Sequence, residues 1–74
     1  MSPSLPHISG SEAIRALQSL GFTVVRQKGS HVVLRRGSSG CVVPKHRELK
    51  VGTLSGVLKQ AEVSQEEFIA ALKA

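Results

Sequence analysis

Apolar residues near the start of the chain recur three and four positions apart. That spacing is typical of a helix with one buried face, and it is formed by Ala13, Ile14, Ala16, Leu17 and Leu20. Ser9 and Glu12 precede this run at the spacing of a capping box, in which the two side chains satisfy each other's backbone N–H groups. Gly21 follows the run and can adopt the left-handed conformation that ends many helices. The pattern predicts a first helix after Ser9.

The middle of the chain changes to short β-branched stretches separated by small polar turns. Such stretches are typical of strands, and we predict three of them: FTVVRQ (22–27), HVVLRR (31–36) and CVVP (41–44). The intervening turns are too short for parallel crossovers, so the strands are expected to form an antiparallel meander. Pro44 indicates the end of a strand or an edge of the sheet.

The last third of the chain returns to helical spacing after a basic loop, 45–52. Thr53 is expected to cap a helix that has Leu54, Val57, Leu58 and Ala61 on one face, and SQEE (64–67) is a second capping box before a short final helix. The order of elements predicts an α+β fold: a helix, a three-stranded antiparallel sheet, a helix and a short C-terminal helix. The helices are expected to cover one face of the sheet and to leave the other free.

The length of 74 residues allows one domain. Prolines at positions 3 and 6 lead us to expect a flexible N-terminal tail over residues 1–8 and a single domain over residues 9–74. No apolar run approaches the ~18 residues of a membrane span, and the N-terminus lacks the features of a signal peptide. One cysteine, Cys41, cannot form an internal disulfide. We therefore expect a soluble, cytoplasmic protein with no membrane partner.

Positive charge is concentrated in the predicted sheet and the loop after it. The formal net charge is +5, and seven of the ten Lys and Arg residues fall between positions 26 and 50: Arg26, Lys28, Arg35, Arg36, Lys45, Arg47 and Lys50. This clustering favours a surface that binds phosphates, although a merely solvated charged surface is the alternative. Phe22 and Phe68 are the sole aromatic residues, which argues against a base-stacking platform.

Acidic residues are too scarce for several kinds of active site. The chain has no Asp, and Glu48 is the one acid between residues 13 and 61. A cluster of carboxylates that holds Mg²⁺ is therefore not expected, and neither is a Ser-His-Asp triad built on Ser30. We predict no metal and no cofactor.

His31 alternates along its strand with apolar residues. Its side chain should share one face with Val33 and Arg35, while Val32 and Leu34 share the other. Two interpretations remain open: an ordinary strand residue, or a proton donor and acceptor placed on an outward, cationic face. RNA carries its own nucleophile, the 2′-OH, so a ribonuclease can work with an acid/base and cations alone. His46 is either a loop residue without a function or a participant in the RNA site. We assign no function to His7.

Three segments together resemble the HicA family, the mRNA interferase toxins of type II toxin–antitoxin pairs. They are GFTVVRQKGSH (21–31), VPKH (43–46) and GTLSGVLKQA (52–61) followed by SQEEF. The resemblance implies a double-stranded-RNA-binding-domain-like fold, an endoribonuclease that cleaves mRNA independently of translation, and a HicB-type antitoxin that covers the active face. It also implies that His31 is catalytic and follows the family's glycine, Gly29, and that His46 lies in the family's Val-Pro-x-His segment. Glu62 departs from the family, because relatives tend to have glycine there.

The combined interpretation is a metal-independent endoribonuclease toxin with His31 as general acid/base. Gly29 and Ser30 are expected to shape the turn that presents this histidine, and the remaining RNA-binding residues are expected to be Arg26, Lys28, Arg35, Lys45 and His46. Two alternatives belong to other functional classes. One is an RNA-binding module that does not cleave, and the other is a protein-interaction domain that binds an acidic partner and no RNA.

Overall fold

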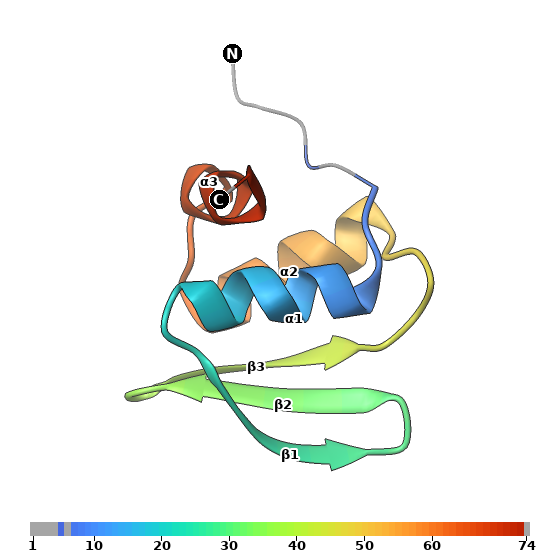
Figure 1. The fold of residues 1–74 in the computed structure, drawn as a ribbon, viewed down its shortest axis with the longest axis vertical. Helices are drawn as coiled ribbons and strands as arrows, with labels where there is room; N and C mark the ends of the chain where they lie inside the picture. Colours follow the sequence, from blue (N-terminus) through green and yellow to red (C-terminus); the bar gives the residue numbers. More distant parts are fainter. Residues whose placement is uncertain (1–4, 6, 74) are drawn as a thin grey trace.

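The computed structural model describes residue 5 and residues 7–73. In chain order the elements are α1 (Gly10–Ser19), β1 (Thr23–Lys28), β2 (His31–Arg36), β3 (Ser39–Pro44), α2 (Val51–Ala61) and α3 (Gln65–Lys73). This order confirms the predicted α+β fold, and the strands form one antiparallel sheet in the order β1-β2-β3. Figure 1 shows three layers, with α1 and α2 above the sheet and α3 on the side of these helices away from it.

Local hydrogen bonds start two of the helices as the sequence predicts. The Ser9 hydroxyl accepts a bond from the Glu12 N–H at 3.1 Å, and the Glu12 carboxylate accepts one from the Ser9 N–H at 3.1 Å. Ser64 and Glu67 form the same reciprocal pair before α3. Each pair satisfies two of the backbone N–H groups that a helix start leaves unpaired.

The predicted start of α2 is wrong by three residues. The helix begins at Val51 after Lys50, which provides no side-chain cap, so Thr53 lies inside the helix. Leu49 explains the shift, because its side chain is buried and its N–H donates to the carbonyl oxygen of Ile8 at 2.7 Å. This anchor fixes the chain just before Val51, and the helix can start without a polar cap.

β3 is also longer than predicted, because the turn before it is short. Arg36 pairs with Ser39, which leaves a turn of two residues, and Lys28 pairs with His31 across a second turn of the same length. Each turn begins with a glycine at positive φ, 59° at Gly37 and 60° at Gly29. Glycine at the first central position is favoured in two-residue hairpin turns.

The alternation along β2 divides the sheet into two faces. Val32 and Leu34 are buried under the helices, whereas His31 and Arg35 are exposed on the opposite side, as predicted. Side chains from the helices and the sheet form one core, whose largest fully buried members are Phe68, Leu17, Leu34, Leu49, Leu54 and Val43. No element covers the outward face in the part of the chain that the structure describes (Figure 1).

The segment before α1 contributes to this core. Leu5 and Ile8, which were predicted to belong to a flexible tail, are buried with exposed fractions of 7% and 8%. His7 lies with its Nδ1 atom 3.1 Å from a Glu48 carboxylate oxygen, at an exposed position. Residues 1–4 and 6 of the predicted tail lie outside the described residues.

Glu62 ends α2 in the left-handed conformation, with φ 58° and ψ 41°. It is the sole residue other than glycine with positive φ among those described. A residue with a Cβ atom is strained there, whereas glycine is not. The resemblance to the HicA family leads us to expect glycine at this position, and glycine would adopt this conformation without strain, whereas Glu62 adopts it against that strain.

Candidate functional site

The hairpin between β1 and β2 presents His31 at its tip. Gly29 and Ser30 form the turn, and the side chain of Gln27 braces it by donating from Nε2 to the Gly29 carbonyl oxygen at 3.2 Å. His31 is the first residue of β2 and stands directly opposite Lys28 in the register. Directly opposed side chains in an antiparallel sheet lie on the same face with Cβ atoms about 4.5–5.5 Å apart. The turn therefore holds an imidazole beside an ammonium group.

The register places the outward residues in rows across the sheet. Lys28, His31 and Pro44 form the row at the hairpin tip, and Arg26 pairs with Val33 in the next row. An open hollow of about 610 Å³ lies over the β1 and β2 members of both rows and is lined by Arg26, Lys28, Gly29, His31 and Val33. A wide, open hollow accommodates an extended chain more readily than an enclosed small molecule. Four of the predicted site residues thus lie together in one depression.

The loop after β3 is attached to the same turn. The N–H of Lys45 donates to the carbonyl oxygen of Ser30 at 2.6 Å, and the carbonyl oxygen of His46 accepts from the N–H of Gly10 at 2.8 Å. The predicted residues Ser30, Lys45 and His46 are therefore connected through their backbones, and all three are exposed. Their side chains reach solvent around the hairpin tip.

Gly10 holds this loop in place, a role that the sequence pattern did not predict. A Cβ atom at this position would clash with the carbonyl oxygen of Pro44 and lie 2.8 Å from the Cα atom of Lys45. Only glycine lets α1 approach the loop so closely. The signal in the sequence was a glycine in the first turn of a helix, where other residues have a higher helix propensity.

Two of the clustered arginines lie apart from the hollow. Arg35 is on the outward face but at the far end of β2, opposite Thr23 and Gly40. Arg36 is partly buried: its guanidinium lies 4.7 Å above the centre of the Phe22 ring and donates to the Leu20 carbonyl oxygen at 2.9 Å. Arg36 therefore stabilises the connection between α1 and β1, while Arg35 remains on the predicted RNA-binding face.

The site is strongly positive, because residues 13–47 contain no acidic side chain. Arg26, Lys28, Arg35 and Lys45 form no ion pair within the described ranges. Cys41 faces the core, where burial raises the pKa of its thiol to about 11. A thiol of this kind stays protonated at neutral pH and has no nucleophilic role. Among residues 5 and 7–73, no three His, Cys or Glu side chains converge as metal ligands would.

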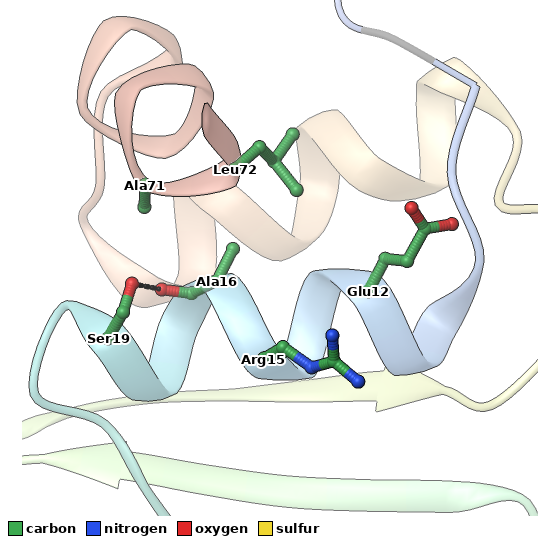
Figure 2. A pocket seen from close by; sticks show the side chains of 6 residues that line it. All are labelled: Glu12, Arg15, Ala16, Ser19, Ala71 and Leu72. Carbon is green, nitrogen blue, oxygen red and sulfur yellow. Dashed lines mark hydrogen bonds between the residues drawn. The ribbon is translucent and has the colours of Figure 1, made fainter. Parts of the chain in front are cut away.

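A second depression, of about 340 Å³, lies between α1 and α3, away from the sheet. Figure 2 shows that the Ser19 hydroxyl in this depression has a structural partner, because it donates to the Ala16 carbonyl oxygen at 2.7 Å. Glu12, which also lines the depression, belongs to the capping box before α1. Ala71 and Leu72 close it from α3. It contains none of the predicted site residues.

Comparison with known proteins identifies the chain's family. Residues 10–63 match the sequence model described as the HicA toxin of bacterial toxin–antitoxin systems. The matched range begins at Gly10, contains the whole sheet with its basic hairpin, and ends just after α2. No curated protein matches the chain. None of the helices that the structure describes has the length and apolar character needed to cross a membrane. The family match covers most of the chain and all of the candidate site, and the protein therefore belongs to the HicA family of bacterial toxins.

Proposed function

We propose that this toxin cleaves mRNA without a metal ion and that His31 acts as its general acid/base. The observation that carries the proposal is the placement of an exposed imidazole between cations on an open sheet face. Lys28 lies opposite His31, Arg26 lies in the next row, and Lys45 is attached to the same turn. Such a surface suits a phosphate backbone, and the imidazole can move a proton near neutral pH.

The chemistry would use the ribose hydroxyl beside the scissile phosphate. In the neutral state His31 takes the 2′-OH proton, the 2′ oxygen forms a bond to phosphorus, and the bond from phosphorus to the 5′ oxygen breaks. The 5′ oxygen receives a proton, either from the imidazolium or from water. The products are a 2′,3′-cyclic phosphate and a 5′-hydroxyl end. Lys28 and Arg26 stabilise the negative charge that develops on the phosphate oxygens.

An antitoxin of the HicB type is the expected protein partner. Membership of a toxin–antitoxin family implies an antitoxin, and the basic outward face is the surface it would need to cover to block RNA. Residues 13–47 supply no acid to balance this face, so an acidic region of the antitoxin would complement it.

Incubation of the pure protein with a long RNA in EDTA tests the proposal. We expect cleavage to continue in the chelator and to leave 2′,3′-cyclic phosphate ends or their hydrolysis products. RNA sequencing with end-specific ligation identifies these ends. Activity that disappears in EDTA and returns with Mg²⁺ would count against this mechanism.

A second function has one observation in its favour. From the residues that the structure describes, the hollow contains one imidazole, that of His31, and no carboxylate, whereas cleavage requires a proton both removed and supplied. An RNA-binding module with no activity would have the same cations and the same hollow. RNA that is bound but intact after long incubation would establish this second function in place of the first.

A further inference from the structure

The rest of the chain covers one edge of the sheet, that of β3, and leaves the other edge, that of β1, open. At β3 the N–H of Val42 donates to Oε1 of Gln60 at 3.4 Å, and the Ser39 hydroxyl donates to Oε2 of Glu62 at 2.7 Å. Both acceptors belong to α2 or to the residue that caps it. Helix α2 therefore covers the edge of β3 with side-chain partners, which is one way in which proteins protect an edge strand.

The edge of β1 has no such cover. All six residues of β1 are exposed, and Figure 1 shows β1 at the margin of the sheet, farthest from the helices. Among the described residues, the backbone of β1 is hydrogen-bonded to β2 alone. A strand with one neighbour leaves a row of N–H and C=O groups that point away from the sheet. These groups are available to another strand.

Two valines on this open edge are exposed to solvent. Val24 pairs with Leu34, so it points to the helix side of the sheet, yet it is 37% exposed because no helix reaches over β1. Val25 lies at the shift in register between Val24 and Arg26 and is 54% exposed. Exposed valines beside unpaired backbone groups favour pairing with an added strand.

The charge of β1 restricts which strand can be added. Arg26 and Lys28 lie in β1, and no acidic residue occurs from position 13 to position 47. In an antiparallel pair of two β1 strands, cations would face cations, which destabilises the pairing. An acidic strand would instead place carboxylates opposite both residues. The charge therefore disfavours a second copy of this chain and favours an acidic partner.

We propose that the free edge of β1 binds an extended, acidic segment of another protein as a fourth strand of the sheet. The backbone of the added strand pairs with the outer groups of β1, its apolar side chains contact Val24 and Val25, and its carboxylates face Arg26 and Lys28. This mode of recognition uses main-chain bonds for affinity and side chains for selection.

One consequence rests on the proposed function. Arg26 and Lys28 also line the hollow that contains His31. Carboxylates of an added strand would pair with these cations, so the added segment would compete with RNA phosphates for them. The docking itself requires only the open edge, the valines and the charge, and it stands whether or not the protein cleaves RNA.

A synthetic peptide with alternating valine and glutamate residues provides the probe. Amide hydrogen exchange, measured by NMR on the intact protein, should show slower exchange in β1 when this peptide is added and no change at Val42 in β3. A peptide of the same length with lysine in place of glutamate is the control and should produce no protection. Binding without protection in β1, or equal protection by the lysine peptide, would overturn the proposal.

Paired variants test the contribution of the valines. The double change Val24→Ser and Val25→Ser should weaken peptide binding by about three- to ten-fold, because two cross-strand contacts are lost. Val51→Ser is the matched control, since Val51 is 45% exposed at the start of α2 and outside the sheet. It should leave the affinity unchanged. Equal losses in both variants would show that the peptide binds elsewhere.

Two further measurements keep the test decisive. If circular dichroism shows that the double variant does not fold, the single variant Val25→Ser replaces it.

Sedimentation of the free protein at low salt should show a monomer. A dimer that protects the β1 amides would instead assign the edge to a second copy of the chain. Peptide binding is measured directly, so a protein that binds the peptide but leaves RNA intact would refute the proposed function and leave this inference standing.

Discussion

His31 is exposed because of its neighbours in the sequence and not because of distant contacts. A two-residue turn starts β2 at this position, and the alternation with Val32 and Leu34 turns its side chain away from the core. A side chain placed in this way contributes little to packing. Its role can therefore be separated from its effect on stability.

Replacement of His31 by Ala should greatly reduce RNA cleavage without unfolding the protein. We expect a change of well under about 2 kcal/mol in the free energy of unfolding, as for other exposed positions. RNA cleavage should fall by about 10²–10⁴-fold, the usual contribution of a positioned acid or base. Thermal melting and an RNA cleavage assay on the same preparation measure both quantities, and growth assays report toxicity.

His7→Ala is the matched control for this variant. His7 is exposed and contacts Glu48 in the loop before α2, away from the hollow. It should keep the parent cleavage rate. A His31→Ala protein that still cuts RNA at the parent rate would refute the catalytic assignment, and one that unfolds would support the structural interpretation of this histidine.

Glu62 provides a second test at the level of one residue. Its left-handed backbone is strained for any residue with a Cβ atom. Glu62→Gly should raise stability by up to about 1 kcal/mol, because relief of strain exceeds the loss of one exposed hydrogen bond to Ser39. Glu62→Ala loses the same bond but keeps the strain, so it should be no more stable than the parent. Chemical denaturation of both variants distinguishes these outcomes.

At the scale of elements, local signals were sufficient for much of the fold. The two capping boxes and the alternation in β2 depend on residues a few positions apart, and each was predictable. The start of α2 was not, because it depends on the buried anchor at Leu49, which contacts the segment before α1. The open edge of β1 could not be predicted from the sequence either. Which strand the helices cover is decided by packing between distant parts of the chain.

The contact between α1 and the loop after β3 decides whether the candidate site is assembled. Gly10→Ala introduces a methyl group into the backbone of Pro44 and Lys45, so it should destabilise the protein by about 1–3 kcal/mol. It should also displace Lys45 and His46 from the hairpin tip. We expect weaker RNA binding and new chemical shifts at Ser30 and His31 in the protein that remains folded.

Gly56→Ala is the control for this change. Gly56 lies in the middle of α2, and no atom outside the adjoining backbone of this helix stands within 4 Å of the position of an added Cβ. Alanine there should raise stability by about 0.5–1 kcal/mol through helix propensity. RNA binding should stay at the parent level. A Gly10→Ala variant as stable as the parent would show that the loop after β3 can move without a loss of stability. The close contact between this loop and α1 would then be unimportant.

At the scale of the whole molecule, charge is divided between two sides. The sheet and the loop after it carry most of the cations, whereas four of the five glutamates lie in or beside the helices: Glu12, Glu62, Glu66 and Glu67. Electrostatic attraction to a polyanion is therefore directed to the outward face of the sheet. The hairpin that carries His31 is on this side, so in the proposed function the charge that attracts RNA would also orient it toward the candidate catalytic group.

Salt dependence tests this orientation. If about three to five cations contact phosphates, the logarithm of RNA affinity should fall with the logarithm of salt concentration with a slope of about −2 to −4. Lys28→Ala should make the slope shallower by about one unit, because one phosphate contact is lost. Lys73→Ala is the matched control: it removes the same charge from the end of α3, on the helical side of the molecule. Fluorescence anisotropy with labelled RNA at several salt concentrations measures all three slopes. A shallower slope in Lys28→Ala alone would place RNA on the sheet, whereas equal changes in both variants would mean that net charge, and not this face, determines binding.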